Sequence, residues 1–427
     1  MEYASNAWIT ASKTCKAKLD KVQNLSLRII HGALKSTPVK ITEKTADLPP
    51  LEKRRELKVL AQGEKMKRLP AHPLHDKLKE EPMNRLKRRS INHVIKDLQL
   101  QHQEILPDSM ESVESLRITP WSPQKRTLQI RKTVPGIELK ATQSAEVQRV
   151  LTLEMLDCTY PSSTWTRVYT DGSAQDATKN GGSGALLKHP DDTAQTISVP
   201  AGALCTNYRA EVHALTAATD CLIKSNKKKT ATVLLTDSLS ALQSLESGKA
   251  DPLTCKLMEN LHILDRSRKI VLQWIPAHVG IVGNETADQL AREGSKLQQP
   301  EVRINYEESK TLLKRDFKTQ WTASNDGYSP AADSISKLER KQQVEIFRLR
   351  TGHCRLKKHL KRVGLSSTAV CECGLGEQTP EHILEDCPLA DRTEAWPQDT
   401  TYHQKLWGTE AELLCTTAFL GKNKIQV

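Results

Sequence analysis

Long apolar runs are missing from this sequence of 427 residues, and no stretch approaches the roughly 18 consecutive apolar residues that a membrane-spanning helix needs. The first residues, MEYASNAWITASKTCKAK, lack the apolar core of a secretory signal peptide. Seven of the ten cysteines are scattered, which argues against a disulfide framework. We therefore expect an intracellular protein in a reducing compartment, without a membrane partner and with nucleus and cytoplasm both open.

Acidic residues are fewer than basic ones: the sequence has 51 Asp and Glu against 63 Lys and Arg, which gives a formal net charge of +12. This balance favours a polyanionic partner over an acidic or membrane one. A basic surface that merely keeps the protein soluble explains the charge about equally well. Internal repeats are absent, so a repeat architecture is not expected.

The chain is longer than a single hydrophobic core usually is, and its patterning changes along its length. Apolar residues recur at helical spacing near both ends, whereas short β-branched runs alternate with amphipathic helices between Trp165 and Gln298. These shifts predict a helical part (1–75), a partly disordered linker (76–162), an α/β domain (163–297), and a helical region (298–427) that contains a Cys/His segment (371–387).

Two acids stand where predicted strands end. Asp171 follows the run TWTRVYT and precedes Gly172 and Ser173, which predict a turn, while Asp237 follows the apolar run ATVLLT. If the two strands are parallel neighbours, both carboxylates leave the same edge of the sheet, where open α/β sheets place their ligands. Each acid also has an ordinary explanation, because Asp237 could cap the helix near Ser238 and Asp171 could be a turn residue.

Two further acids lie on predicted helices. Glu211 shares a helical face with Leu215 and other apolar residues, so its burial would be costly unless a cation or several hydrogen-bond donors compensate its charge. Asp288 borders the inward face of the last helix of the α/β region, where an ordinary first-turn acid is the alternative. His278 precedes that helix in a Gly-flanked loop and is a candidate proton carrier or simply a loop histidine. Four carboxylates at one point would require divalent cations.

The segments YTDGS, NYRAE, LLTDS and PAHVGIVGNETAD occur in this order, and they make residues 163–297 similar to the type I ribonuclease H domain. The resemblance is to the version carried by non-LTR, Jockey-like retrotransposon reverse-transcriptase polyproteins. It implies an α/β fold with a mixed five-stranded sheet flanked by helices. It also implies an endonuclease that hydrolyses the RNA strand of RNA–DNA hybrids with two Mg²⁺ ions, for which Mn²⁺ can substitute.

The same resemblance implies roles for residues of this sequence. His278 would assist proton transfer or product release. In the two-metal arrangement that we expect, Asp171 bridges both ions, Glu211 and Asp237 share one, and Asp288 holds the other. Lys224 and residues 227–229 are expected either at phosphates or in a solvated loop. Contacts to the hybrid are expected at Gly172, Ser173, Asn207, Ser238 and Asn284.

A second candidate metal site lies near the end of the chain. Cys371, Cys373, His382 and Cys387 offer three thiolates and an imidazole, enough for one tetrahedral Zn²⁺. Their spacing differs from that of retroviral knuckles, so unpaired thiols are the alternative, although the segment resembles one that follows ribonuclease H in the same retroelement polyproteins. Nearby basic residues would bind single-stranded nucleic acid or merely cover a helix: Arg348, Arg350, Arg355, Lys357, Lys358, Lys361 and Arg362.

The opening residues resemble the thumb region that follows the reverse-transcriptase palm in those polyproteins. A Tyr-x-Asp-Asp strand is absent from the sequence, so we expect no polymerase activity. The alternatives to a nuclease are a catalytically idle nucleic-acid-binding protein and an interaction protein derived from a retroelement. A different nuclease or a transposase of the same fold superfamily is a further alternative.

Overall fold

A computed structural model describes residues 2–70, 72–80, 89–106, 128–137, 143–225, 229–247, 252–325, 327–393 and 395–427. The chain divides into two units, one made of residues 1–60, 84–98 and 314–427, and the other of residues 61–83 and 99–313. The four-part division predicted from the sequence stays a prediction. Within its linker, residues 81–88, 107–127 and 138–142 lie outside the described residues.

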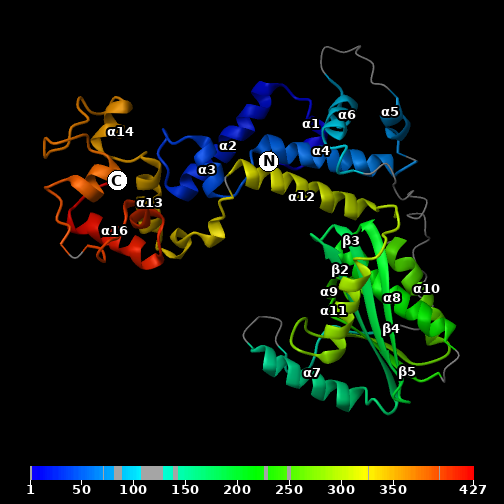
Figure 1. The fold of residues 1–427 in the computed structure, drawn as a ribbon. Helices are drawn as coiled ribbons and strands as arrows, with labels where there is room; N and C mark the ends of the chain where they lie inside the picture. Colours follow the sequence, from blue (N-terminus) through cyan, green and yellow to red (C-terminus); the bar gives the residue numbers. More distant parts are fainter. Residues whose placement is uncertain are drawn as a thin grey trace. The chain divides into compact units, whose positions relative to one another are not determined.

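The second unit is built around one mixed sheet of six strands (Figure 1). Their order across the sheet is β1-β6-β5-β2-β3-β4. β3 pairs antiparallel with β2 and with β4, whereas the pairs β1–β6, β6–β5 and β5–β2 are parallel. The predicted α/β class with a mixed, helix-flanked sheet is therefore confirmed. The strands are β1 (Gln129–Arg131), β2 (Trp165–Gln175), β3 (Lys179–Lys188), β4 (Ala194–Leu204), β5 (Ala231–Thr236) and β6 (Ile270–Trp274).

The five strands expected for residues 163–297 are present as β2–β6, and a sixth strand, β1, joins the sheet from outside that segment. β1 lies within the region expected to be a linker, and its Ile130 pairs with Leu272 of β6. Three residues are too few to show the alternation by which a strand is recognised in a sequence. The same region also contains the helices α6 (Ile91–Gln101) and α7 (Ala145–Thr159).

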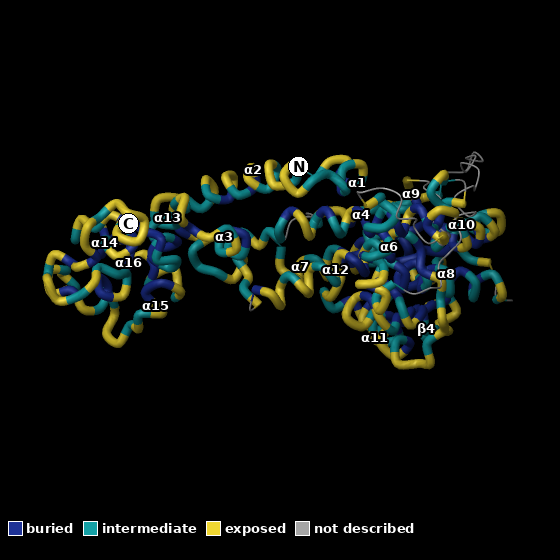
Figure 2. The backbone as a smooth tube through the Cα atoms, turned by 90° about the horizontal axis from the view of Figure 1, so that it is seen from above, coloured by how far each residue is buried: buried dark blue, intermediate teal, exposed yellow. Residues whose placement is uncertain are grey.

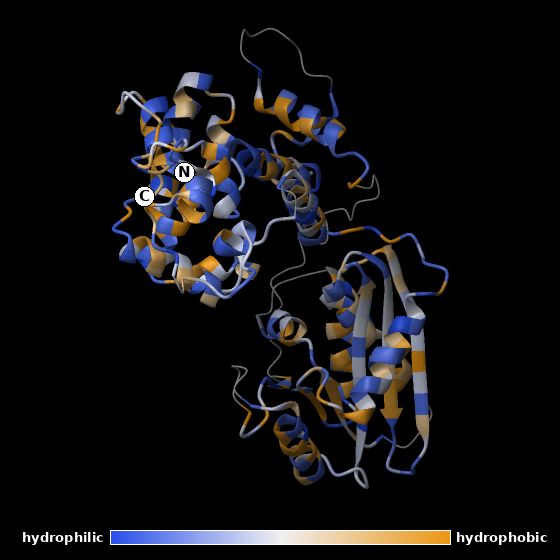
Figure 3. Cartoon of the chain, turned by 60° about the vertical axis from the view of Figure 1, so that its left-hand side comes forward, coloured by the Kyte–Doolittle hydropathy of each residue, from blue (hydrophilic) through white to orange (hydrophobic). Residues whose placement is uncertain are grey.

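Helices cover both faces of the sheet and enclose two apolar clusters. On one face, α8 (Asn207–Lys224), α9 (Leu239–Ser247) and α10 (Pro252–Asp265) bury residues such as Leu215, Leu242 and Leu261 against the strands. On the other face, α7 and α11 (Val282–Gly294) contribute Leu156 and Ala287. Figure 2 shows the buried stretches beneath the helices, and Figure 3 shows the hydrophobic residues of the strands.

The first unit is mainly helical, as predicted for the extensions at both ends of the chain. Its C-terminal core brings together Leu349, Leu384 and Phe419 from separate elements. None of the described helices is long and apolar enough to cross a membrane.

The remaining α-helices of the two units are α1 (Ser5–Trp8), α2 (Lys13–His31), α3 (Val39–Thr45), α4 (Leu51–Lys67), α5 (His75–Lys79), α12 (Tyr306–Ser324), α13 (Arg340–Thr351), α14 (Lys357–Arg362), α15 (Tyr402–Trp407) and α16 (Glu410–Lys422).

Candidate active site

Asp171 of β2 and Asp237, the residue after β5, lie side by side, because β2 and β5 are parallel neighbours, as the prediction from the sequence required. β2 and β5 pair in register up to Thr170 and Thr236, so the next residue of each chain segment reaches the same level of the sheet. Both strands also pair through buried apolar residues, which fixes this register. The sheet therefore brings two carboxylates together that are 66 positions apart in the sequence (237 − 171).

The turn predicted at Gly172 and Ser173 is wrong, because β2 continues to Gln175. Residues 171–175 pair with β3, and the chain turns only at residues 176–178. Gly and Ser favour turns locally, but the hydrogen bonds of the neighbouring strand extend the ladder through them. Asp171 thus lies inside a strand, where the backbone on both sides holds its side chain in place.

Glu211 approaches Asp171 because α8 packs directly on Gly172. A Cβ atom at Gly172 would overlap the backbone of Ala210 and Glu211, so only glycine permits this approach. The Thr206 hydroxyl accepts a hydrogen bond from the Arg209 N–H (3.2 Å) and caps the first turn of the helix. The cap and the glycine together place Glu211 one turn inside α8, facing the sheet.

Carboxylate oxygens of Asp171, Glu211 and Asp237 all lie within 4.8 Å of one another. Asp171 is 6% exposed and Glu211 is 9% exposed. Asp171 Oδ1 accepts a hydrogen bond from the Gly172 N–H (2.7 Å), but Glu211 Oε2 is buried and has no hydrogen-bond partner among the described residues. A buried oxygen without a partner is costly, and a bound cation would satisfy it.

The environment disfavours the charged form of all three acids. Burial, then the charges of Asp237 and Asp288, raises the pKa of Asp171 to about 7. Burial, then the charges of Asp171 and Asp237, raises the pKa of Glu211 well above its usual value. Burial also raises the pKa of Asp237, against a hydrogen bond from Asn284 and the positive charge of His278. The three acids repel one another, as expected of a site that binds divalent cations.

Asp288 lies in a neighbouring group rather than among these three acids. Its side chain is close to His278 and Glu285, with ligand atoms within 4.8 Å of one another, and it pairs with Arg292 (2.6 Å). Its charge nevertheless raises the pKa of Asp171 and of Asp237, so it borders the centre. Glu285 was missed by the sequence reasoning, although it lies one helical turn before Asp288 in the segment GNETAD.

The residues expected to contact a hybrid occupy different environments. Asn284 is only 2% exposed, and its side-chain N–H donates to Asp237 Oδ2 (3.3 Å), so it orients a carboxylate. Asn207 is exposed at the first residue of α8. Ser238 accepts a hydrogen bond from the Ala241 N–H near the start of α9 (3.4 Å). Their contacts with a substrate stay predictions.

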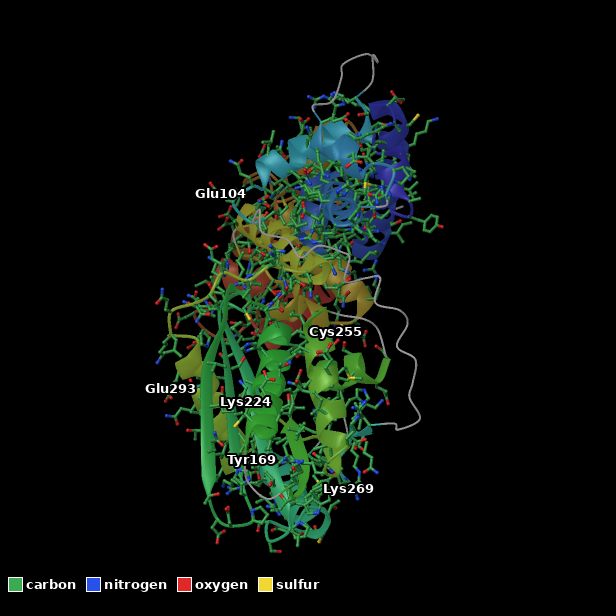
Figure 4. The ribbon with its side chains drawn as sticks, turned by 90° about the vertical axis from the view of Figure 1, so that its right-hand side faces the viewer. Glu104, Tyr169, Lys224, Cys255, Lys269 and Glu293 are labelled. Carbon is green, nitrogen blue, oxygen red and sulfur yellow. The ribbon has the colours of Figure 1, made fainter. Side chains whose placement is uncertain are left out.

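Ser173 lines a surface depression of about 550 Å³. Asn180 of the next strand and Arg292 of α11 line the same depression, so its lining includes polar and basic residues. Lys224 ends α8 and is exposed (Figure 4), as is Lys229. Residues 227 and 228 of the predicted lysine loop lie outside the described residues.

The four Cys/His residues near the end of the chain converge. Cys371 Sγ lies 3.7 Å from Cys387 Sγ, Cys373 Sγ lies 3.2 Å from His382 Nε2, and all four ligand atoms are within 4.8 Å of one another. The Leu375 N–H points at Cys373 Sγ (3.5 Å), as a backbone donor to a thiolate does. The donor set and its compactness fit one tetrahedral zinc ion.

Two of the basic residues expected to bind nucleic acid make contacts within the fold. Arg350 forms a buried ion pair with Asp333 (2.7 Å), and Arg348 donates to the backbone oxygens of Gly32 and Val427. For the buried side chain of Arg350 the expectation of phosphate contact is wrong, because its ion-pair partner Asp333 is remote from the basic run and could not be recognised from the spacing. For the half-buried Arg348 it stays a prediction.

Comparison with known proteins identifies the α/β unit. Residues 163–296 match the model of the RNase H family. A ribonuclease H of Maricaulis maris (strain MCS10) is 29% identical over 140 residues, which cover 30% of this chain and 91% of that protein. The N-terminal RNase H domain of a Mycobacterium tuberculosis protein, solved as a fusion with maltose-binding protein, is 23% identical (31% of this chain, 94% of that chain, TM-score 0.26).

RNase H1 from the halophilic archaeon Halobacterium salinarum NRC-1 is 22% identical (30% of this chain, 96% of that chain, TM-score 0.26). These matches cover less than a third of the chain. The segment matched by the family model, residues 163–296, contains the strands and helices that carry the acidic centre. The segment 163–296 is therefore an RNase H domain within a longer chain.

Proposed function

We propose that this chain is a metal-dependent endonuclease that hydrolyses the RNA strand of RNA–DNA hybrids. The observation that carries the proposal is the convergence of Asp171, Glu211 and Asp237 at one edge of the sheet, inside a segment that matches the RNase H family. Three carboxylates gathered within 4.8 Å of one another are suited to hard divalent cations. The raised pKa values of these acids, and the Glu211 oxygen that has no hydrogen-bond partner among the described residues, also indicate a site that binds cations.

Two Mg²⁺ ions, with Mn²⁺ as a substitute, are the cofactors that fit these oxygens. Bound there, they would ready a water for attack on a phosphodiester and stabilise the leaving oxygen. We propose Asp171 as the ligand shared by both ions, Glu211 and Asp237 as ligands of one, and Asp288 as the ligand of the other. Asp288 would have to leave Arg292 to serve in this role.

The remaining residues of the site have positioning and proton-transfer roles in this proposal. Asn284 orients the Asp237 carboxylate through its amide. His278 is exposed on its loop, so its ring can exchange protons with solvent and with a departing product. Glu285 holds that loop by accepting a hydrogen bond from the Gly280 N–H (3.3 Å). Gly172, Ser173, Asn207 and Ser238 are the proposed contacts to the hybrid.

The test is cleavage of a labelled RNA–DNA duplex by the full-length protein in Mg²⁺, beside RNA–RNA and DNA–DNA duplexes. We expect cleavage of the RNA strand of the hybrid only, and a loss of about 10³-fold or more in rate for Asp171→Asn. Wild-type rates in that variant would disprove the assignment. Tight hybrid binding by wild type without cleavage would favour the alternative, a catalytically idle nucleic-acid-binding protein.

We further propose that Cys371, Cys373, His382 and Cys387 bind one Zn²⁺. Such a site would contribute to folding of its unit, because ligands spaced along the chain are held together only when the ion is bound. Mass spectrometry of the native protein should find one zinc per chain, which is lost in Cys387→Ala. Equal zinc content in both proteins would refute the site. The predicted binding of single-stranded nucleic acid near this site would be measured by its salt dependence.

The intracellular location and the retrotransposon origin stay proposals. The relatives named above carry no retrotransposon description, so that origin rests on the sequence motifs alone.

A further inference from the structure

Residues 128–137 and 143–160 precede the segment that matches the RNase H family, yet they are part of the same fold. β1 extends the sheet by pairing with β6. Tyr160, which follows α7, is 1% exposed, and its hydroxyl donates to Gln273 Oε1 of β6 (3.1 Å). Gln273 in turn donates to the backbone oxygen of Thr133 (3.0 Å). These contacts tie the extension to the edge of the RNase H sheet.

α7 is held in place at its C-terminal end. Met155 and Leu156 are buried in the cluster that also contains Ile281 and Ala287, which flank the start of α11. The Arg167 guanidinium of β2 donates to the backbone oxygen of Leu156 (2.9 Å). A helix fixed by buried apolar residues and by hydrogen bonds holds its exposed side chains over one part of the surface.

Arg149 is an exposed residue of α7, and its side chain lies beside the loop that carries His278. This loop comprises residues 275–281. A Cβ atom added to Gly280 would be 3.6 Å from Arg149 Nη1, which is ordinary van der Waals contact. Gly280 also donates to Glu285, which is grouped with His278 and Asp288. Arg149 thus lies beside Gly280 of the His278 loop, and Gly280 is hydrogen-bonded to Glu285 of the neighbouring acidic group.

Arg149 has no ion-pair partner among the described residues. Glu146, one turn earlier, accepts hydrogen bonds from its own backbone N–H and from the Ser144 hydroxyl, and these lower its pKa. Its carboxylate is therefore engaged at the start of α7. The centre nearby is rich in carboxylates, which repel the phosphates of an approaching strand, and a free guanidinium at its border offsets that repulsion.

We propose that Arg149 binds a backbone phosphate of the hybrid beside the His278 loop, so that α7 contributes to substrate binding by the nuclease. The inference rests on the proposed function. Guanidinium is suited to this task because its planar donors match a phosphate in a bidentate geometry. A phosphate contact of this kind adds affinity and orientation without reading the sequence.

The test measures hybrid binding by full-length protein in the Asp171→Asn background, where cleavage does not interfere, over a series of salt concentrations. Adding Arg149→Ala should weaken binding about tenfold at low salt and reduce the slope of log K against log salt by about 0.9. In otherwise wild-type protein, Arg149→Ala should raise KM by a similar factor and change kcat less than about twofold.

Two control variants separate charge from packing. Arg149→Lys should keep most of the salt slope, and Lys132→Ala should leave it unchanged, because the Lys132 ammonium on the same extension is paired with Glu246 (2.6 Å). An Arg149→Ala slope equal to that of the parent would overturn the inference. A wild-type protein that neither binds nor cleaves the hybrid would instead overturn the proposed function, and the inference with it.

Discussion

Replacing Asp171 by asparagine is expected to stabilise the RNase H unit when divalent cations are absent. Burial and the neighbouring carboxylates raise the pKa of Asp171 from its ordinary value of 3.8 to about 7. A shift of about three pH units corresponds to about 4 kcal/mol, since each unit is worth about 1.4 kcal/mol. The carboxamide removes this penalty and keeps an oxygen that accepts the hydrogen bond from the Gly172 N–H.

The pH dependence follows from the direction of the shift. Between pH about 4 and about 7 the folded carboxyl keeps a proton that the unfolded chain has already lost, so the stability of the wild-type unit falls as pH rises through this window. The advantage of Asp171→Asn should therefore be absent below pH about 4 and complete above pH about 7. Mg²⁺ should restore the stability of the wild type and have much less effect on the variant.

The stability difference between Asp171→Asn and wild type is measured by hydrogen exchange of the amides in β2 and β5, in EDTA at several pH values. This measurement is local and does not require both units to unfold together. Intrinsic exchange rates are divided out at each pH. Glu154→Gln is the matched control, because Glu154 is an exposed carboxylate on α7 and should change nothing. Lower protection in Asp171→Asn than in wild type at pH 8 would refute the reasoning.

Three other substitutions test the packing around the centre. Gly172→Ala should lower stability by about 3 kcal/mol and abolish cleavage, because its methyl group overlaps the α8 backbone; thermal melting and the hybrid assay measure both effects. Asn284→Ala should lower kcat about tenfold by freeing the Asp237 carboxylate, and an unchanged kcat would contradict its orienting role. Tyr160→Phe should cost about 1 to 2 kcal/mol in β6 amide protection, with kcat unchanged, because the Gln273 side chain loses a buried hydrogen bond.

Much of the sheet and part of the centre could be predicted from the sequence. Asp171 and Asp237 follow two runs that predict strands, and the apolar run before Asp237 predicts a buried central strand. The parallel pairing of β2 with β5, which the sequence supports only as a condition, brings the two acids together. Glu211 is conspicuous because a carboxylate interrupts the buried face of a helix. These predictions succeeded because hydrophobic periodicity reports directly on which side of an element is buried.

Other features could not be predicted from the sequence, because they depend on partners that are far away in the chain. β2 runs past Gly172 since β3 supplies its hydrogen bonds, and the short β1 exists because β6 offers a free edge. The Asp288 carboxylate pairs with Arg292 and lies close to His278 and Glu285. Its spacing in the sequence is equally compatible with a place among the other three acids. Arg149 gains its position only through the packing of α7.

The oxygen, nitrogen and sulfur donors that are available, their order, and their positions on apolar elements all follow from the amino-acid sequence. Which of these donors meet depends on the folded chain, because charge repulsion, desolvation and hydrogen bonding depend on distances between residues that are remote in sequence. The close approach of α8 at Gly172 illustrates this, since a missing side chain on one strand determines where a carboxylate on a helix comes to lie.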